Sequence, residues 1–264
     1  MAVDTKISPL ASVDPAAKIG KDVVIGPFAY VEGDVEIGDR TEIRAHAQIL
    51  NGARIGKDCV IHGNAVIAGE PQDLKFVGEY STAIIGDRCK IRECVTVNRG
   101  TASKGTTIIG NDVLLMAYSH IAHDCVLKDH IIIGNASQIA GEVEIDDWAI
   151  VSGGALVHQF TRISQHVMIQ GGSRVGKDIP PYTLIGREPI AYCGINIVGL
   201  RRRGFSNDQI YRINDIYRTI YQRGLNNSEA LDVVESEIPE CEERNLILNF
   251  IKGSKRGIVR GSID

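Results

Sequence analysis

Two histidines and an aspartate lie within one short segment and have the side chains best suited to chemistry. Residues 117–126 read AYSHIAHDCV, so His120 and His123 are three positions apart and Asp124 follows the second histidine. An imidazole with an ordinary pKa of about 6.5 can accept a proton near neutral pH. An alcohol is a weak nucleophile toward a thioester and needs such a base. The segment is therefore a candidate centre for general-base catalysis, although His123 alone could equally be a solvated histidine at the surface.

An aliphatic residue at every sixth position organises most of the chain. The series is unbroken over residues 19–67, resumes over 85–97 and continues over 109–175. A period of six fits neither the 3.6-residue helix nor the two-residue strand alternation, and it is the signature of hexapeptide parallel β-helices. Three hexapeptides make one triangular coil, with the aliphatic residue inside and glycine, asparagine or aspartate permitting the tight corners. The pattern predicts an all-β parallel β-helix.

Successive coils stack at about 4.8 Å, so residues 18 positions apart form columns. This spacing predicts that His123, Gly141 and Gln159 lie on neighbouring coils and line one cleft. A glycine beside the base allows its backbone N–H to approach a developing oxyanion closely. Gly141 could also be one more corner glycine, and spacing alone does not decide between these interpretations.

The β-helix is expected over residues 1–190, with two interruptions near 70–82 and 100–106 that keep the register of the repeat. Both are predicted to be loops that leave the coil. Loops on a rigid scaffold often carry function, and a tolerated surface insertion is the alternative interpretation.

Helical signals replace the repeat in residues 191–264. Ser206 or Asn207 is the expected N-cap of a helix that stops near Gly224, a second helix begins near Ser228, and a third covers residues 246–251. Because the open end of a β-helix needs a cover, this domain is expected to cap the final coil.

Composition excludes several classes of protein. A formal net charge of −4 argues against binding of nucleic acid, which requires a clustered basic surface. The sequence has neither a signal peptide nor an apolar stretch of roughly 18 residues, so we expect no membrane span and a cytoplasmic location.

Four segments resemble the UDP-N-acetylglucosamine O-acyltransferase family: QDLK at 72–75, HIAHDC at 120–125, VHQF at 157–160 and GLRRRGF at 199–205. The resemblance extends over essentially the whole chain. It implies a left-handed coil and a homotrimer with sites between subunits. It also implies transfer of a 3-hydroxyacyl group from acyl carrier protein to the 3-hydroxyl of UDP-N-acetylglucosamine, the first step of lipid A biosynthesis, without a metal or another cofactor.

The resemblance also implies roles for individual residues. His123 resembles the general base, Asp124 its partner and Gly141 the oxyanion donor. The residues that resemble those orienting the sugar and the acyl chain are Asp73, Lys75, His120, His158 and Gln159, those that resemble nucleotide-binding positions are Asn196, Arg202 and Arg203, and Gly171 resembles a position that limits acyl length. The arginines could instead be a solvated run of charge or could contact acidic acyl carrier protein.

The chain departs from the family pattern at three positions. Glu142 and Asn98 stand where the family has histidine, and Pro189 also replaces a histidine. The first two bear on contacts to the acceptor, which leaves open an amino-sugar nucleotide in place of UDP-N-acetylglucosamine. Gly171 leaves room for a long acyl chain, so Gly171→Met is expected to shift the preference in a donor length series toward shorter chains.

Three other functions remain open from the sequence. A carbonic anhydrase on this scaffold would bind zinc through histidines, for which His120, His123 and His158 are candidates. An acetyltransferase would prefer acetyl-coenzyme A to acyl carrier protein. A β-helix that only scaffolds partners would keep its function in His123→Ala.

Overall fold

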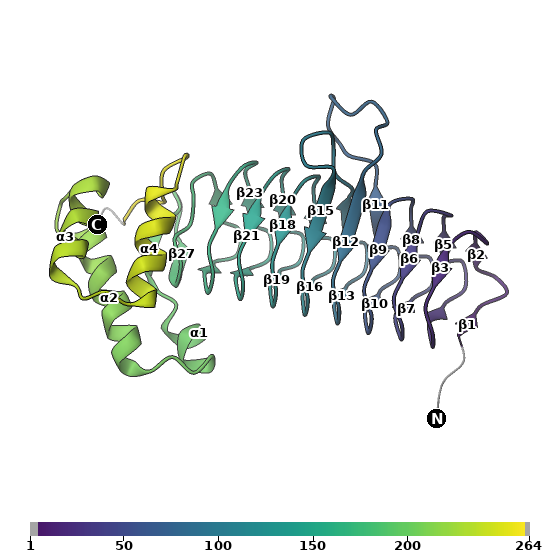
Figure 1. Cartoon of the computed structure of the whole chain (residues 1–264), viewed down its shortest axis with the longest axis horizontal. Coiled ribbons are helices and arrows are strands. Elements are labelled where there is room, and N and C mark those ends of the chain that lie inside the picture. The colour runs from purple at the N-terminus through teal and green to yellow at the C-terminus, as the bar shows by residue number, and fades with distance from the viewer. Residues whose placement is uncertain (1–4, 262–264) are drawn as a thin grey trace.

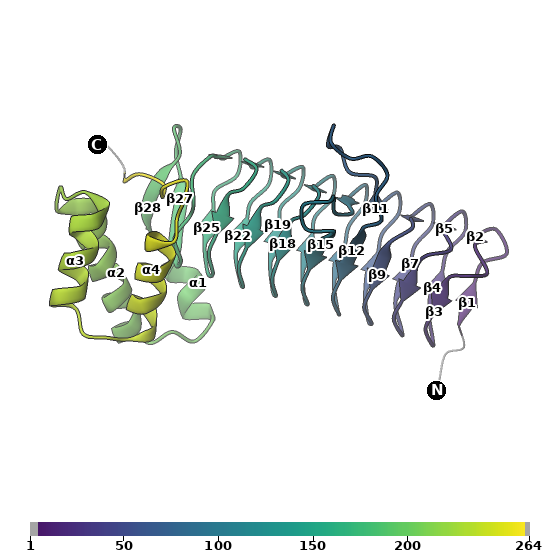
Figure 2. The same cartoon turned by 45° about the horizontal axis from the view of Figure 1, so that its top comes forward.

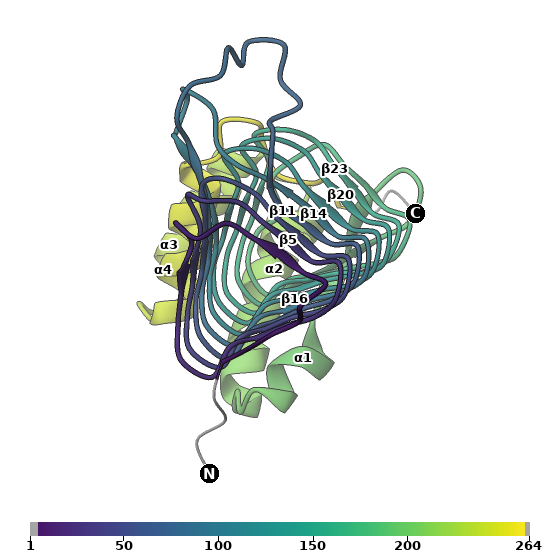
Figure 3. The same ribbon diagram turned by 90° about the vertical axis from the view of Figure 1, so that its right-hand side faces the viewer.

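A long prism of stacked coils ends in a group of helices (Figures 1 and 2). The computed structural model describes residues 5–261. Seen along its length, the prism has a triangular cross-section (Figure 3). The predicted left-handed parallel β-helix with a C-terminal helical domain is therefore confirmed.

Three sheets, here called sheets A, B and C, form the faces of the prism. Sheet A contains β1 (Lys6–Ile7), β4 (Val24–Ile25), β7 (Glu42–Ile43), β10 (Val60–Ile61), β13 (Lys90–Ile91), β16 (Leu114–Leu115), β19 (Ile132–Ile133), β22 (Ile150–Val151), β25 (Met168–Ile169), β27 (Thr183–Gly186) and β28 (Ala191–Ile195). Sheet B contains β2 (Ser12–Val13), β5 (Tyr30–Val31), β8 (Gln48–Ile49), β11 (Val66–Gly69), β14 (Thr96–Asn98), β17 (His120–Ile121), β20 (Gln138–Ile139), β23 (Leu156–Val157) and β26 (Arg174–Val175). Sheet C contains β3 (Lys18–Ile19), β6 (Glu36–Ile37), β9 (Ala53–Ile55), β12 (Thr82–Ile85), β15 (Thr106–Ile109), β18 (Val126–Leu127), β21 (Glu144–Ile145) and β24 (Arg162–Ile163). The pairs are parallel except for β27 with β28.

The periodic aliphatic residues form the core. Ile61 pairs with Ile43 on one side and Ile91 on the other, and all three are completely buried. The residue before each of them in its strand faces outward, because side chains alternate along a strand. The sixfold pattern thus reports one inward side chain for each face of each coil.

The glycines that follow these aliphatic residues have a different role from the one expected. The corner residues in the left-handed region include Arg40, Asp58 and Asp112, with φ between 56° and 59°. Gly38 and Gly86 lie outside that region, but a Cβ on either would lie less than 3 Å from the backbone of the next coil. The expectation that these glycines supply the corner conformation is therefore wrong. Their place is set by the close approach of successive coils.

Two loops rise from the corner between sheets B and C (Figures 1 and 3). The first runs from the end of β11 to β12, and the second from the end of β14 to β15. The two loops are joined where the Ala102 N–H donates to Glu79 Oε1 at 2.8 Å.

The helical domain comprises α1 (Ile197–Arg202), α2 (Asn207–Gln222), α3 (Asn227–Glu237) and α4 (Glu242–Lys252). Ser206, one of the two predicted candidates, is the N-cap of α2, and it forms a capping box with Gln209. The short α1 was not anticipated. The fully buried Tyr217 of α2 donates its hydroxyl to the Pro181 carbonyl at 2.6 Å, which ties the helix to the end of the prism. No helix within residues 5–261 has the length and apolar character needed to cross a membrane.

Candidate active site

His123 and Asp124 form a hydrogen-bonded pair at the corner between sheets B and C. His123 Nδ1 lies 2.8 Å from Asp124 Oδ2. Asp124 has a φ of 60°, so the chain turns sharply here and adjacent side chains meet that would diverge in a strand. The arrangement leaves the opposite nitrogen, Nε2, as the one that can take a proton from a substrate.

The Asp124 carboxylate is completely buried and is surrounded by donors from the second loop. The Thr101 N–H and hydroxyl donate to it at 3.0 and 2.6 Å, and the Lys104 N–H donates at 3.1 Å. Burial on its own would raise the pKa of Asp124, but the hydrogen bonds from Thr101, His123 and the loop backbone together lower that pKa. An ionised Asp124 favours the His123 tautomer that carries its proton on Nδ1.

Gly141 lies against the ring of His123 from the neighbouring coil. A Cβ at position 141 would lie 2.6 Å from both Cε1 and Nε2 of the imidazole. The φ of Gly141 is outside the left-handed region, so the corner conformation does not require glycine here, but contact with His123 does. No group within residues 5–261 accepts a hydrogen bond from the Gly141 N–H.

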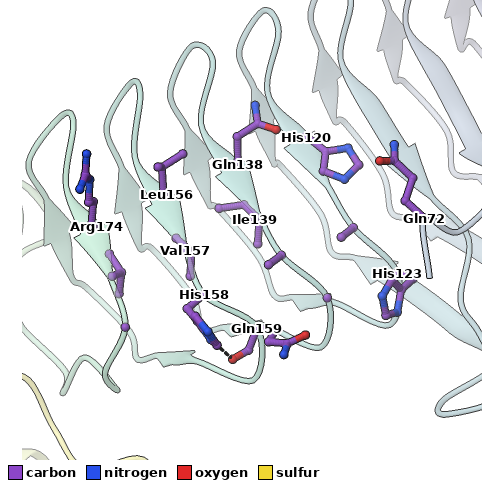
Figure 4. A pocket seen from close by; sticks show the side chains of 15 residues that line it. Gln72, His120, His123, Gln138, Ile139, Leu156, Val157, His158, Gln159 and Arg174 are labelled. Carbon is purple, nitrogen blue, oxygen red and sulfur yellow. Dashed lines mark hydrogen bonds between the residues drawn. The ribbon is translucent and has the colours of Figure 1, made fainter. Parts of the chain in front are cut away.

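Two hollows meet at His123. The first, of about 580 Å³, is a groove on the outer face of sheet B that runs from His123 to Arg174 (Figure 4). Leu156 is the large apolar side chain exposed in it, whereas the side chains of Ile139 and Val157 behind it are buried in the core. The second, of about 640 Å³, lies beneath the loops. Its polar lining consists of Gln72, Asp73, Lys75, Glu79, Thr101, Ser103, Glu142 and Gln159. His123 therefore borders both the groove and the pocket beneath the loops.

His120, His158 and Gln159 border the groove near His123, and Gln159 also borders the second pocket (Figure 4). His120 Nδ1 lies 2.7 Å from Thr96 Oγ1, and burial, with a smaller effect of His123, lowers the pKa of His120. A neutral His120 can hydrogen-bond a ligand without adding charge.

Asp73 and Lys75 enter the site from the first loop. Asp73 Oδ2 lies 3.9 Å from His123 Nε2, while Asp73 Oδ1 accepts the Lys75 N–H at 2.9 Å. The predicted site residues around the base therefore come from three neighbouring coils and from one loop.

Known proteins show the same combination of prism and helices. A family model described as UDP N-acetylglucosamine O-acyltransferase, domain 2, matches residues 178–259, and one for bacterial transferase hexapeptide repeats matches 16–51, 34–69 and 106–137. An acyl-[acyl-carrier-protein]–UDP-N-acetylglucosamine O-acyltransferase from Stenotrophomonas maltophilia is 41% identical over 257 residues, which cover 97% of this chain and 98% of the relative. This chain belongs to the UDP-N-acetylglucosamine O-acyltransferase family. It is accordingly an O-acyltransferase.

Solved members of this O-acyltransferase family have the same fold. The UDP-N-acetylglucosamine acyltransferase from Bacteroides fragilis is 57% identical, with a TM-score of 0.95 over 96% of this chain and 100% of that chain. The Arabidopsis UDP-N-acetylglucosamine acyltransferase is 30% identical, with a TM-score of 0.87 over 96% of this chain and 100% of that chain.

One group of predicted site residues lies apart from His123 in the single O-acyltransferase chain. Asn196 caps α1, with its Oδ1 accepting the Gly199 N–H at 3.1 Å. Arg203 stacks over the Trp148 ring at 5.2 Å, while Arg202 is exposed. Figure 3 shows α1 below sheet A, on the side away from the loops. These residues therefore do not share a pocket with the base within one chain.

Gly171 also lies away from the base of this O-acyltransferase. It is exposed at the corner between sheets A and B, directly before β26, and a Cβ there would lie 3.0 Å from the Gly153 carbonyl oxygen. It borders neither hollow described above. Its role in acyl length stays a prediction.

Glu142 and Asn98, which stand where the O-acyltransferase family pattern has histidine, each form a defined hydrogen bond near the site. Glu142 Oε1 accepts the Ser103 hydroxyl at 2.9 Å, which brings its carboxylate to the second pocket. Asn98 is buried and donates to the Glu70 carbonyl at 2.9 Å, so it fastens the start of the first loop.

Sequence reasoning missed the donors to Asp124. Thr101 and Lys104 were recognised only as part of an interruption in the repeat, and Gln72 only as a letter in the QDLK segment. The available signal in the sequence was Thr101, a hydrogen-bonding residue directly after Gly100 in a loop that leaves the register of the repeat unchanged.

Within residues 5–261, no group of three or more His, Cys, Asp or Glu side chains is arranged to bind a metal ion.

Proposed function

We propose that this enzyme transfers a (R)-3-hydroxyacyl group from acyl carrier protein to the 3-hydroxyl of UDP-N-acetylglucosamine, the first step of lipid A biosynthesis. The observation that carries the proposal is the position of His123, which is hydrogen-bonded to the buried Asp124 on one side and lies against Gly141 on the other. The names of the curated relatives, which specify acyl carrier protein and UDP-N-acetylglucosamine, support the choice of substrates.

His123 acts as the general base in this proposal. Nε2 takes the proton from the sugar 3-hydroxyl while the oxygen forms a bond to the thioester carbonyl carbon. The Gly141 N–H donates to the resulting oxyanion. As the carbon–sulfur bond breaks, the thiolate of the carrier arm recovers the proton from the imidazolium, which Asp124 has stabilised in the meantime.

The two hollows suggest where the substrates bind. The groove on sheet B has an apolar wall that suits an acyl chain, whereas the pocket beneath the loops has the hydrogen-bonding groups that a sugar requires. Asp73, Lys75, His120, His158 and Gln159 would orient the two substrates. Both hollows reach His123, so hydroxyl and thioester can meet there.

We also propose that the active enzyme is a homotrimer, because the outer face of sheet A is apolar over its C-terminal half, from β16 to β27. The outward residues there are Leu114, Ile132, Ile150, Met168 and Leu184, whereas the N-terminal half of the face carries Lys6, Glu42 and Lys90 beside Val24 and Val60. A continuous apolar stripe of this kind is typical of subunit interfaces. Since α1 lies beside this face, Asn196, Arg202 and Arg203 could reach the nucleotide in a neighbouring subunit's site.

The reaction and the base can be tested together. Purified protein is incubated with UDP-N-acetylglucosamine and a length series of 3-hydroxyacyl-acyl carrier proteins, and His123→Ala is compared with wild type. Loss of a general base is expected to lower transfer by about a hundredfold or more. The matched control is His46→Ala, because His46 is exposed and stacks on Phe28 in the N-terminal coils.

Other outcomes of this experiment identify other functions. Full activity in His123→Ala would contradict the proposed base, and a preference for acetyl-coenzyme A would indicate an acetyltransferase. If wild type transfers to no hydroxyl acceptor, an amino-sugar nucleotide is the next substrate to test, because Glu142 adds a carboxylate to a pocket that already holds Asp73 and Glu79. An amine would be favoured by this charge.

We propose that no metal or cofactor takes part and that the enzyme works in the cytoplasm. Metal analysis of the purified protein, together with transfer measured in the presence of a chelator, tests the first point. Stoichiometric zinc with loss of transfer on chelation would favour the metalloenzyme alternative through His120, His123 and His158.

A further inference from the structure

The second loop supplies every donor to Asp124 other than His123. Asp124 Oδ1 accepts the backbone N–H groups of Thr101 and Lys104, and Oδ2 accepts the Thr101 hydroxyl at 2.6 Å and faces His123 Nδ1 at 2.8 Å. The Thr101 hydroxyl and His123 therefore share one carboxylate oxygen. A displacement of Thr101 would change the orientation of the base directly.

The hydroxyl of Thr101 has its direction fixed by a second contact. Thr101 Oγ1 accepts the Ser103 N–H at 3.2 Å, so its own proton is left to point at Asp124. Thr101 is buried, so its hydroxyl is largely shielded from water. Hydrogen bonds to a charged group in such surroundings are stronger than those between neutral groups.

The loop itself is anchored at its base and at its tip. The Gly100 N–H donates to the Thr82 carbonyl at 3.1 Å, and the Thr82 N–H donates to the Gly105 carbonyl at 3.0 Å. The Ala102 N–H donates to Glu79, which belongs to the loop that carries Asp73. The position of Thr101 is thus set by the scaffold and by the first loop.

We propose that Thr101 is a positioning residue for catalysis: its N–H and hydroxyl fix the Asp124 carboxylate and hold Oδ2 against His123 Nδ1. Thr101 acts through Asp124 and His123, so this inference rests on the proposed acyl transfer. It extends that proposal to a loop outside the hexapeptide repeat.

Thr101→Val tests the inference because valine keeps the branched shape and the backbone N–H but lacks the hydroxyl. We expect kcat to fall about tenfold or more, with KM for the sugar nucleotide changed less than about twofold. The acid limb of the kcat/KM profile is expected to shift to higher pH, since a carboxylate that has lost a donor takes up a proton more readily. Thr101→Ser, which restores the hydroxyl, is expected to recover both kcat and the profile.

Thr106→Val is the matched control. It removes the same hydroxyl at the foot of the same loop, where Thr106 Oγ1 accepts from Thr82 Oγ1 at 2.9 Å and makes no contact with Asp124. We expect its kcat and pH profile to match wild type, and circular dichroism checks that each variant is folded.

Wild-type kcat and an unchanged acid limb in Thr101→Val would overturn the positioning role. Equal losses in Thr101→Val and Thr101→Ser would also contradict it, because the hydroxyl would then not be the cause. A wild-type enzyme that transfers no acyl group is a separate result, which overturns the proposed reaction on which this inference depends.

Discussion

At the scale of single residues, the site is built around one imidazole with two different neighbours. Asp124 holds one edge of His123 through a hydrogen bond, and Gly141 lies against the opposite nitrogen. Position 141 requires glycine because any side chain there would occupy the space of the His123 ring. The proposed base and the proposed oxyanion donor therefore lie side by side, as reaction at one carbon would require.

Gly141→Ala is expected to reduce activity without unfolding the protein. The added methyl would lie 2.6 Å from Nε2, so the ring must turn away from Asp124, and we expect kcat to fall by about tenfold to a thousandfold. Steady-state kinetics with both substrates measure the change. Gly33→Ala provides a comparison in the N-terminal coils, where the Cβ would meet only the exposed Asp14 carboxylate at 3.2 Å. A wild-type kcat in Gly141→Ala would contradict this steric argument, because it would show that the His123 ring accommodates the methyl group.

The sequence allows the column of His123, Gly141 and Gln159 to be predicted because all three belong to the regular repeat. Their spacing of 18 converts directly into neighbouring coils. The pairing of Asp124 with Thr101 could not be predicted in this way. It joins residues 23 positions apart across a loop with no period, and its geometry depends on backbone contacts that side-chain patterns do not record.

At the scale of elements, two-residue strands are stable because each coil pairs with the coils on both sides. Inward residues such as Ile61 are buried by those neighbours, and glycines such as Gly86 let the coils come close. The aliphatic period revealed this arrangement in advance. The sequence did not reveal why glycine follows many of these aliphatic residues, because glycine is equally suited to a positive φ and to close packing of the backbone.

Two glycines at the same place in the repeat are expected to respond differently to alanine. A Cβ at Gly86 would lie 2.7 Å from the Gly110 carbonyl group, whereas a Cβ at Gly176 meets no atom within 4 Å. Overpacking of this kind costs about 1–3 kcal/mol, so Gly86→Ala is expected to lower Tm by several degrees. Gly176→Ala is expected to leave Tm within about a degree. Thermal unfolding followed by circular dichroism compares them, and equal Tm values would contradict the close-approach explanation.

At the scale of the whole molecule, the three faces of the prism differ in character. The C-terminal half of sheet A presents an apolar stripe. Sheet B carries the groove that leads to His123, and the corner between sheets B and C carries the loops. The helical domain closes the end of the prism and places α1 beside sheet A. A trimer formed through sheet A would bring Arg203 of one subunit towards the site of another.

A charge in the middle of the apolar stripe is expected to break this assembly. Ile132 faces outward from β19, between Leu114 and Ile150 in the neighbouring strands, so Ile132→Asp would place a carboxylate in the proposed interface. We expect monomers in sedimentation velocity and a loss of transfer. Ile84→Asp, on the outer face of sheet C, is expected to remain trimeric. A wild-type monomer with full activity would rule out the shared site.

The stacking of the coils also fixes how far the base lies from the helical cap. Three ladder steps, from β17 through β20 and β23 to β26, separate the strand that precedes His123 from the last strand of sheet B. Each step is about 4.8 Å, and a fraction of a coil cannot be added without turning every side chain to another face. The distance between His123 and the helical domain is therefore restricted to a set of fixed values. It can lengthen or shorten only by whole turns of the prism.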